Sequence, residues 1–279
     1  MVRYAVTGAT GWLGRAAAAL LRERGDDVVC FGSRAREGVL ALEDLPDVPH
    51  DVLLHYAYVT RDHLADGSWE RYVAANVAIT DIVLQSVARH QPALFYASTG
   101  AAEQPGGMRD NPYAALKRLD EHVLRDASGG RCAVARVYNV GGPYATKPEV
   151  FLLTDLVQQG LSGQPLQLRS NRRVIRSYVD VTDLAAWAVA AAGTDVCVGT
   201  AGTEEVEAAD VAEAVHSCLG LTSPIVRPQL DPTLPDDRYA ADPEPWLRSC
   251  AALGVEPRDL RAQVERTAAY AREAVATAV

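Results

Sequence analysis

Tyr113 and Lys117 stand four positions apart, directly after Pro112, where a helix is expected to begin. This spacing places the phenol and the ammonium on one face of a helix. A tyrosine with the usual pKa of about 10 is a poor acid–base group at neutral pH, and a nearby ammonium lowers that pKa by stabilising the phenolate. The pair therefore predicts a proton transfer by Tyr113 that Lys117 assists.

Two hydroxyl residues, Ser98 and Thr99, end the short apolar run that begins at Leu94. The carboxyl ends of parallel strands border the crevice in which such sheets bind their ligands. If the run is one of these strands, both hydroxyls face the crevice, and they become partners for the tyrosine and the lysine.

A glycine-rich loop, Thr7–Gly14, lies between the first apolar run and the first helical pattern. Gly8 permits a tight turn, Gly11 lets a pyrophosphate approach the backbone, and Gly14 lets the helix pack close to the sheet. The start of the helix also offers free N–H groups to the anion. Three glycines could form an ordinary turn, but this placement predicts a dinucleotide site. The expected cofactor contacts are Gly8, Thr10, Gly11, Trp12, Leu13 and Gly14.

The end of the second expected strand bears on the choice of cofactor. Enzymes that use NAD usually carry Asp or Glu there, to bind the ribose hydroxyls. This chain has Ser33 and Arg34 instead, and an arginine can bind a 2′-phosphate. The sequence therefore favours NADP, with Ser33 and Arg34 as contacts. The alternative is that Arg34 and Arg36 are solvated loop charges.

Apolar runs alternate with helical patterns through the first half of the chain. The alternation predicts an α/β fold of the Rossmann type, in which a doubly wound parallel sheet is covered on both faces. The first helix is the clearest, with apolar residues at helical spacing from Leu13 to Leu21. The expected strands are Tyr4–Thr7, Val28–Phe31, Val52–Tyr56, Leu94–Ala97 and Cys132–Val137.

The pattern changes after Pro143. We expect residues 1–143 to form the dinucleotide-binding domain. Residues 144–279 are expected to form mostly a smaller C-terminal substrate-binding lobe, with some segments returning to the sheet. Two short strands, Pro165–Arg169 and Val174–Val179, predict a hairpin whose turn carries Arg172 and Arg173. The proline-rich region Thr222–Pro245 is expected to wrap the surface.

Composition excludes several classes of protein. The chain has 279 residues, a net charge of −9 and a pI near 5.2, which argues against nucleic-acid binding. Its five cysteines form no Cys-x-x-Cys pair and its six histidines show no metal-ligand spacing, so neither a disulfide framework nor a metal site is expected. No signal peptide and no apolar run of membrane-spanning length are visible, so a cytoplasmic protein without a membrane partner is expected.

Taken together, these motifs resemble the extended short-chain dehydrogenase/reductases, the family of NAD-dependent epimerases and dehydratases that includes nucleotide-sugar ketoreductases. The resemblance runs nearly from end to end. The matching segments are Thr7–Gly14, Asp44-Leu45, Asp51–Ala57, Tyr72–Val77, Tyr96–Gly100, Tyr113–Lys117, Arg136–Pro143, Arg176–Asp183, and Arg238 to Asp242 followed by Leu253–Pro257.

The resemblance assigns a role to each residue of the catalytic group. Thr99 polarises the substrate carbonyl, with Ser98 as the second choice. Tyr113 is the acid–base residue, and Lys117 holds the nicotinamide ribose and tunes the tyrosine. Asn76 matches the asparagine of the family's helix, which is structural and binds water.

The resemblance also assigns residues to the two ligands. Asn139 and Arg176 match positions that meet a substrate diphosphate, and Arg238 is a weaker match at the nucleotide end. The Asp44-Leu45 pair corresponds to an acidic-Leu pair placed against adenine. The remaining expected cofactor contacts are His55, Tyr56, Ala57 and Tyr138, together with Tyr113 and Lys117.

Two departures from the family pattern matter. Only 16 residues separate Arg34 from Asp51, so the usual crossover helices must be missing or very short, which weakens the transfer to Asp44. The family's dehydratases carry Asp-Glu directly after the catalytic threonine, whereas Gly100 and Ala101 follow it here. The acid and the base needed for elimination are therefore missing.

The leading prediction is the NADPH-dependent reduction of a keto group, at C4, on a nucleotide-linked deoxysugar. The first alternative is a nucleotide-sugar C4 epimerase that keeps NAD tightly bound. A reductase of a non-sugar carbonyl and a dinucleotide sensor without catalysis are two others, although a sensor should have lost Tyr113 or Lys117. Helices such as Trp69–Arg89 and Tyr113–Arg125 often pair in this family, so a homodimer is a further expectation.

Overall fold

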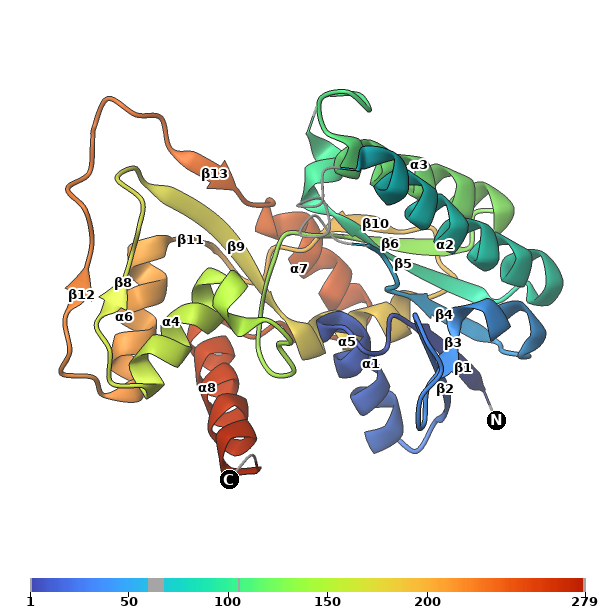
Figure 1. Cartoon of the computed structure of the whole chain (residues 1–279), viewed down its shortest axis with the longest axis horizontal. Coiled ribbons are helices and arrows are strands. Elements are labelled where there is room, and N and C mark those ends of the chain that lie inside the picture. The colour runs from blue at the N-terminus through green and yellow to red at the C-terminus, as the bar shows by residue number, and fades with distance from the viewer. Residues whose placement is uncertain (1, 60–67, 105, 278–279) are drawn as a thin grey trace. The chain divides into compact units, whose positions relative to one another are not determined.

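The computed structural model describes residues 2–59, 68–104 and 106–277 (Figure 1). The chain divides into two compact units. The first comprises Met1–Val137 and Ala185–Val198, and the second comprises Tyr138–Leu184 and Gly199–Val279.

Within the described residues, seven strands of the first unit form one sheet in the order β3–β2–β1–β4–β5–β6–β10. Neighbouring strands from β3 to β6 are parallel. The direction of winding reverses between β1 and β4, and in such sheets the ligand crevice opens at the carboxyl ends of the strands on either side of this point. This is the predicted Rossmann-type sheet. The strands are β1 (Arg3–Thr7), β2 (Asp27–Gly32), β3 (Leu40–Ala41), β4 (Val52–His55), β5 (Ala93–Thr99), β6 (Cys132–Val137) and β10 (Cys197–Gly199).

Helices cover both faces of this sheet, and the alternation of side chains along each strand shows which face each helix covers. α2 (Trp69–His90) and α3 (Pro112–Ala127) pack on one face, where Phe31 and Tyr96 belong to the buried core (Figure 1). α1 (Trp12–Glu23) lies on the other face, where its Arg22 contacts Cys30. Trp187 of α5 (Val181–Ala191) packs on Phe95, with the ring centroids 6.1 Å apart.

The connection from β2 to β4 is short, as the sequence predicted. It contains only the two-residue strand β3 and one 3-10 helix, η1 (Leu42–Asp47), where a longer crossover would carry an α-helix. The apolar side of η1 supplies Leu42 and Leu45 to the core beneath α2. A single short helix therefore covers this part of the sheet.

In the second unit, the central strand β9 (Val174–Asp180) pairs with β7 (Asn139–Gly141), β11 (Glu205–Glu207) and β13 (Asp237–Tyr239). Its core gathers apolar side chains of α4, α6 and α8 around Tyr178 of β9. The helices of this unit are α4 (Leu152–Leu161), α6 (Ala208–Leu219), α7 (Pro243–Ala252) and α8 (Leu260–Thr277), and the 3-10 helix η4 (Pro148–Val150) precedes α4. Another 3-10 helix, η3 (Gly100–Glu103), follows β5 in the first unit.

The predicted hairpin across Arg172 and Arg173 is wrong. The strand before it, β8 (Leu166–Gln167), pairs in parallel with β12 (Ile225–Val226), and β9 takes other partners. The proline-rich region supplies both β12 and β13, so it joins the sheets of this unit. No helix of the described residues is long and apolar enough to cross a membrane.

One buried hydroxyl joins β1, β4 and the glycine loop. The Thr7 Oγ1 atom accepts hydrogen bonds from the backbone N–H groups of Tyr56 and Ala57, both at 3.2 Å, and lies 2.7 Å from Nδ1 of His55. Burial, assisted by the charge of Lys117, lowers the pKa of His55 to about 3, so the imidazole is neutral at physiological pH. The Thr7 hydroxyl and Nδ1 of the neutral imidazole therefore share one hydrogen bond.

Replacement of this hydroxyl tests its contribution to the fold. Thr7→Val keeps the side-chain shape but removes the hydroxyl partner of the Ala57 N–H and of Nδ1, and it leaves the Tyr56 N–H with only its 3.3 Å bond to the Thr7 carbonyl oxygen. We therefore expect the free energy of unfolding to fall by roughly 2 kcal/mol or more. Thr7→Ser keeps the hydroxyl and should lose much less. Urea unfolding of the three proteins measures the difference, and equal stabilities for Thr7→Val and the unmodified chain would contradict the assignment.

Candidate active site

The glycine loop after β1 owes two of its glycines to close packing inside the chain. Gly8 has a φ of +65°, and a Cβ there would lie 2.7 Å from the backbone nitrogen of Ala57. A Cβ on Gly14 would collide with the carbonyl oxygen of Gly8. Both positions therefore require glycine before any ligand is considered.

Gly11 is different, because a Cβ there would make only an ordinary contact of 3.4 Å with the Gly8 carbonyl oxygen. It is the N-cap of α1, which has no side-chain cap and no acidic residue in its first turn. The N–H groups at this helix start can therefore receive an anion. The loop fits a dinucleotide pyrophosphate; Thr10 and Leu13 lie half-buried in it, and Trp12 is buried.

The residues predicted to contact the adenosine part of the cofactor differ in exposure. Ser33 and Arg34 are exposed directly after β2, and Asp44 is exposed on η1. Leu45, by contrast, is fully buried in the core of the sheet. The acidic-Leu pair thus has one side chain in solvent and one in the interior.

At the end of β4, the three predicted contacts also differ. His55 is buried and stacks on Tyr96, with ring centroids 5.3 Å apart, so its imidazole belongs to the core. The Tyr56 ring packs on Phe95 at 5.2 Å, and Ala57 adjoins the glycine loop through its bond to Thr7.

The two hydroxyls at the end of β5 have separate environments. Ser98 donates to Glu121 of α3, which also forms a two-pronged ion pair with Arg136. Thr99 caps η3 by accepting from the backbone N–H of Ala101. Because the Ser98 hydroxyl is committed to a carboxylate, Thr99 is the better candidate for a substrate contact.

Helix α3 carries the predicted acid–base pair and begins at a defined point. The Asn111 side chain caps it by accepting from the backbone N–H of Ala114, and Pro112 occupies its first turn. Tyr113 is then half-buried in the first turn, and Lys117 is buried one turn later. The Lys117 ammonium donates to the carbonyl oxygen of Ala97 at 2.8 Å. This bond ties α3 to β5 two residues before Thr99.

The Lys117 ammonium lies in a largely apolar place, and burial lowers its pKa to about 7. Asp120, one turn further along α3, opposes this decrease. The Asp120 carboxylate accepts from the hydroxyls of Thr80 and Tyr96, both at 2.9 Å. Sequence reasoning missed Asp120, although its position three residues after Lys117 on the same helix could have revealed it.

Asn76 is buried. Its Oδ1 atom accepts from the Val59 N–H at 2.9 Å, and its Nδ2 group donates to the carbonyl oxygens of Tyr72 and Val59 at 3.1 and 3.4 Å. The asparagine of α2 therefore holds the segment that follows β4.

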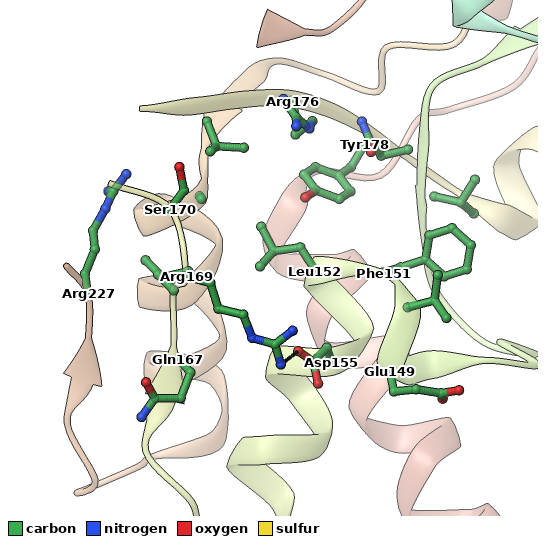
Figure 2. A pocket seen from close by; sticks show the side chains of 16 residues that line it. Glu149, Phe151, Leu152, Asp155, Gln167, Arg169, Ser170, Arg176, Tyr178 and Arg227 are labelled. Carbon is green, nitrogen blue, oxygen red and sulfur yellow. Dashed lines mark ion pairs between the residues drawn. The ribbon is translucent and has the colours of Figure 1, made fainter. Parts of the chain in front are cut away.

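The second unit contains a cavity of about 360 Å³ (Figure 2). Its apolar wall includes Phe151, Leu152 and Tyr178, and Asn139 also lines it. Asn139 donates to the carbonyl oxygens of Ser177 and Tyr239, so its side chain also links the strands of the sheet.

Three arginines line the same cavity, each paired with a carboxylate. Arg176 bonds the side chain and the carbonyl oxygen of Asp237, Arg227 forms a two-pronged pair with Glu207, and Arg169 reaches toward Asp155 (Figure 2). Sequence reasoning had selected only Arg176 of these three. Arg227 lies in the proline-rich region, where no periodic pattern indicated a site.

Two other predicted residues of the second unit do not line the cavity. Arg238 forms an ion pair with Glu205 of β11, and Tyr138 packs on Tyr239 with ring centroids 4.7 Å apart. Arg238 therefore has a structural partner within its own sheet.

A family model described as "NAD dependent epimerase/dehydratase family" matches residues 4–199. A curated relative, UDP-glucuronate 4-epimerase 6 of Arabidopsis thaliana, is 27% identical over 266 residues, and the match covers 79% of this chain and 57% of the relative. The chain thus spans little more than half the length of that protein.

Solved structures of similar fold include two 4-epimerases. The UDP-glucose 4-epimerase of Thermus thermophilus, in complex with NAD, has a TM-score of 0.76 at 22% identity, and the match covers 98% of this chain and 100% of the other. The UDP-glucuronic acid 4-epimerase of Bacillus cereus, in complex with UDP-glucuronic acid and NAD, has a TM-score of 0.72 at 18% identity and the same coverage. At these identities the likeness establishes the fold.

The comparisons favour one of the alternatives that the sequence left open. The relatives are 4-epimerases, so the epimerase alternative fits them better than the ketoreductase that was the leading prediction. The predicted preference for NADP is not supported either, since both structures contain NAD.

The contrast between Gly11 and Gly14 provides a test of the dinucleotide site. Gly11→Ala should change the free energy of unfolding by no more than about 1 kcal/mol, the usual range for changes at an N-cap. It should weaken dinucleotide binding about tenfold or more, because the methyl group projects where the pyrophosphate must approach. Gly14→Ala should instead destabilise the fold. Thermal unfolding and calorimetric titration with NAD and NADP measure both effects, and unchanged dinucleotide affinity in Gly11→Ala would contradict the site.

Proposed function

Since the chain belongs to the NAD-dependent epimerase/dehydratase family, as its motifs predicted, we propose that it inverts C4 of a nucleoside-diphosphate sugar with a bound NAD. The observation that carries the proposal is the attachment of α3 to β5 through Lys117 and Ala97. It places Tyr113 and Thr99 on adjoining elements of the Rossmann-type unit that also carries the glycine loop.

The proposed roles of these side chains follow from their chemistry. Tyr113 takes the proton of the sugar C4 hydroxyl and later returns it, while the hydroxyl of Thr99 holds the same oxygen. The charge of Lys117 stabilises the phenolate form of Tyr113. A dinucleotide held by the glycine loop at the start of α1 would supply the reversible uptake and return of a hydride at C4. Epimerisation therefore has no net oxidation, and the cofactor need not leave between turnovers.

The cavity of the second unit supports a nucleotide substrate. Phe151 and Tyr178 offer apolar surface to a ring, and the guanidinium groups of Arg169, Arg176 and Arg227 offer charge to a diphosphate. A protein with a net charge of −9 needs such a local concentration of arginines to hold an anionic substrate.

The residues after Thr99 favour epimerisation over dehydration. Gly100 and Ala101 begin η3 and carry no ionisable side chain, whereas an elimination needs an acid and a base at the reacting carbons.

A second candidate is a reductase that consumes NADPH, and the exposed Ser33 and Arg34 after β2 support it. The end of β2 carries no carboxylate to select the ribose hydroxyls of NAD. This candidate needs a cofactor that exchanges with solution at every turnover.

One experiment separates the two candidates. The protein is purified gently, its retained ligands are identified by mass spectrometry, and it is then incubated with UDP- and dTDP-hexoses without added cofactor. We expect bound NAD and interconversion of 4-epimers. If the protein is instead isolated without a dinucleotide and consumes NADPH when a 4-keto nucleotide sugar is added, that result would contradict the epimerase proposal and support the reductase.

Arg176 provides a test of the substrate class. Arg176→Ala should raise KM for a nucleotide sugar about tenfold or more while kcat changes little, because a diphosphate contact is the same in the ground and transition states. Arg176→Lys keeps the charge but not the two-pronged geometry, so its KM should lie between the two. Dinucleotide affinity, measured as a control, should not change. If KM is unchanged in Arg176→Ala, Arg176 does not contact the diphosphate.

A further inference from the structure

The ammonium of Lys117 is enclosed by aromatic rings. It lies 3.7 Å from the ring centroid of Tyr58 and 4.6 Å from that of Tyr96, and it donates to the Ala97 carbonyl oxygen. Only 4% of the residue is exposed. A cation over the face of an aromatic ring is attracted by the negative potential of that face, and the attraction grows when water is excluded.

The position of Tyr58 is fixed by the chain around it. Asn76 of α2 binds both the N–H and the C=O of the next residue, Val59. The Tyr58 ring also makes edge contacts with Tyr72 and Tyr113, with centroids 6.4 and 5.9 Å apart. The ring that covers the lysine is therefore held by the helix that carries Asn76 and adjoins the acid–base tyrosine.

The protonation state of Lys117 depends on opposing influences from every element around it. Burial disfavours the ammonium, whereas Asp120 and Glu121 of α3 favour it. His55 of β4 is neutral, and among the described residues Tyr96 of β5 and Tyr58 present ring faces to the ammonium, with Tyr113 in edge contact with Tyr58. A ring face at 3.7 Å adds a further influence that favours the charged form.

We propose that Tyr58 is a positioning residue that caps the Lys117 ammonium, that Asn76 holds this cap in place, and that the cap keeps the lysine charged beside Tyr113. The role of the cap in turnover rests on the proposed function. The effect of the cap on Lys117 does not, because it can be measured in the free protein.

The lysine content of the chain makes that measurement direct. Lysine occurs only at positions 117 and 147, so a protein labelled with ¹³C at lysine Cε gives two signals, and Lys147→Arg assigns them. Tyr58→Leu removes the ring face and keeps an apolar side chain, whereas Tyr58→Phe keeps the ring face. Tyr58→Met replaces Tyr58→Leu if the latter does not fold.

We expect the pKa of Lys117 to fall by about one pH unit in Tyr58→Leu, which corresponds to the loss of a buried cation–π contact, and to stay near its original value in Tyr58→Phe. Equal values in the unmodified protein and Tyr58→Leu would overturn the proposal. A decrease in Tyr58→Phe as large as that in Tyr58→Leu would overturn it too, because the ring face would then not be the cause.

The pH profile of turnover tests whether the charge that Tyr58 stabilises on Lys117 is needed for catalysis. Since the lysine must be charged, activity should decline as the pH rises through the pKa of Lys117, and this decline should begin about one pH unit lower in Tyr58→Leu than in Tyr58→Phe. A shifted lysine pKa with an unshifted profile would overturn the catalytic part of the proposal. If the unmodified protein converts no nucleotide sugar, the proposed function fails, and the titration alone still decides whether Tyr58 caps the lysine.

Discussion

The proposed active site of the Rossmann-type unit depends on one buried charge, the Lys117 ammonium between α3 and β5. Its bond to the Ala97 carbonyl oxygen fixes the helix on the strand that ends at Thr99, and the Asn111 cap sets where that helix starts. A buried ammonium is costly unless its surroundings compensate for the lost water. Asp120 and the Tyr58 ring face provide that compensation, so the residues that stabilise this charge also determine where Tyr113 stands.

In the second unit, the charged side chains that line the cavity are paired with carboxylates. Arg176 and Arg227, which line its cavity, are held by Asp237 and Glu207, so under the proposed function their guanidinium groups are already placed before a diphosphate binds. Less side-chain freedom is then lost on binding, although the paired carboxylates weaken the net positive potential. This arrangement favours selection of an anion with a definite shape over attraction of any anion.

Sequence reasoning succeeded where a feature is local. The glycine loop, the first helix and the short crossover before Asp51 depend on residues that are neighbours in the chain, and β6 has the bounds that were predicted. Sequence reasoning failed where the structure of a segment depends on a residue far away in the chain. The expected hairpin was replaced by pairing of β8 with β12, and Arg238 was selected without its partner Glu205. Tyr58 carries no motif of its own, because its role depends on a clamp from Asn76 and on a lysine from another helix.

The central claim is that a hydride leaves C4 of a nucleotide sugar and returns to the same carbon. Incubation of the protein with a UDP-hexose deuterated at C4, without added cofactor, tests it most directly. The account predicts a 4-epimer that retains the deuterium at C4, and no conversion by Tyr113→Phe. Replacement of the deuterium by solvent hydrogen during conversion, or undiminished conversion by Tyr113→Phe, would contradict it.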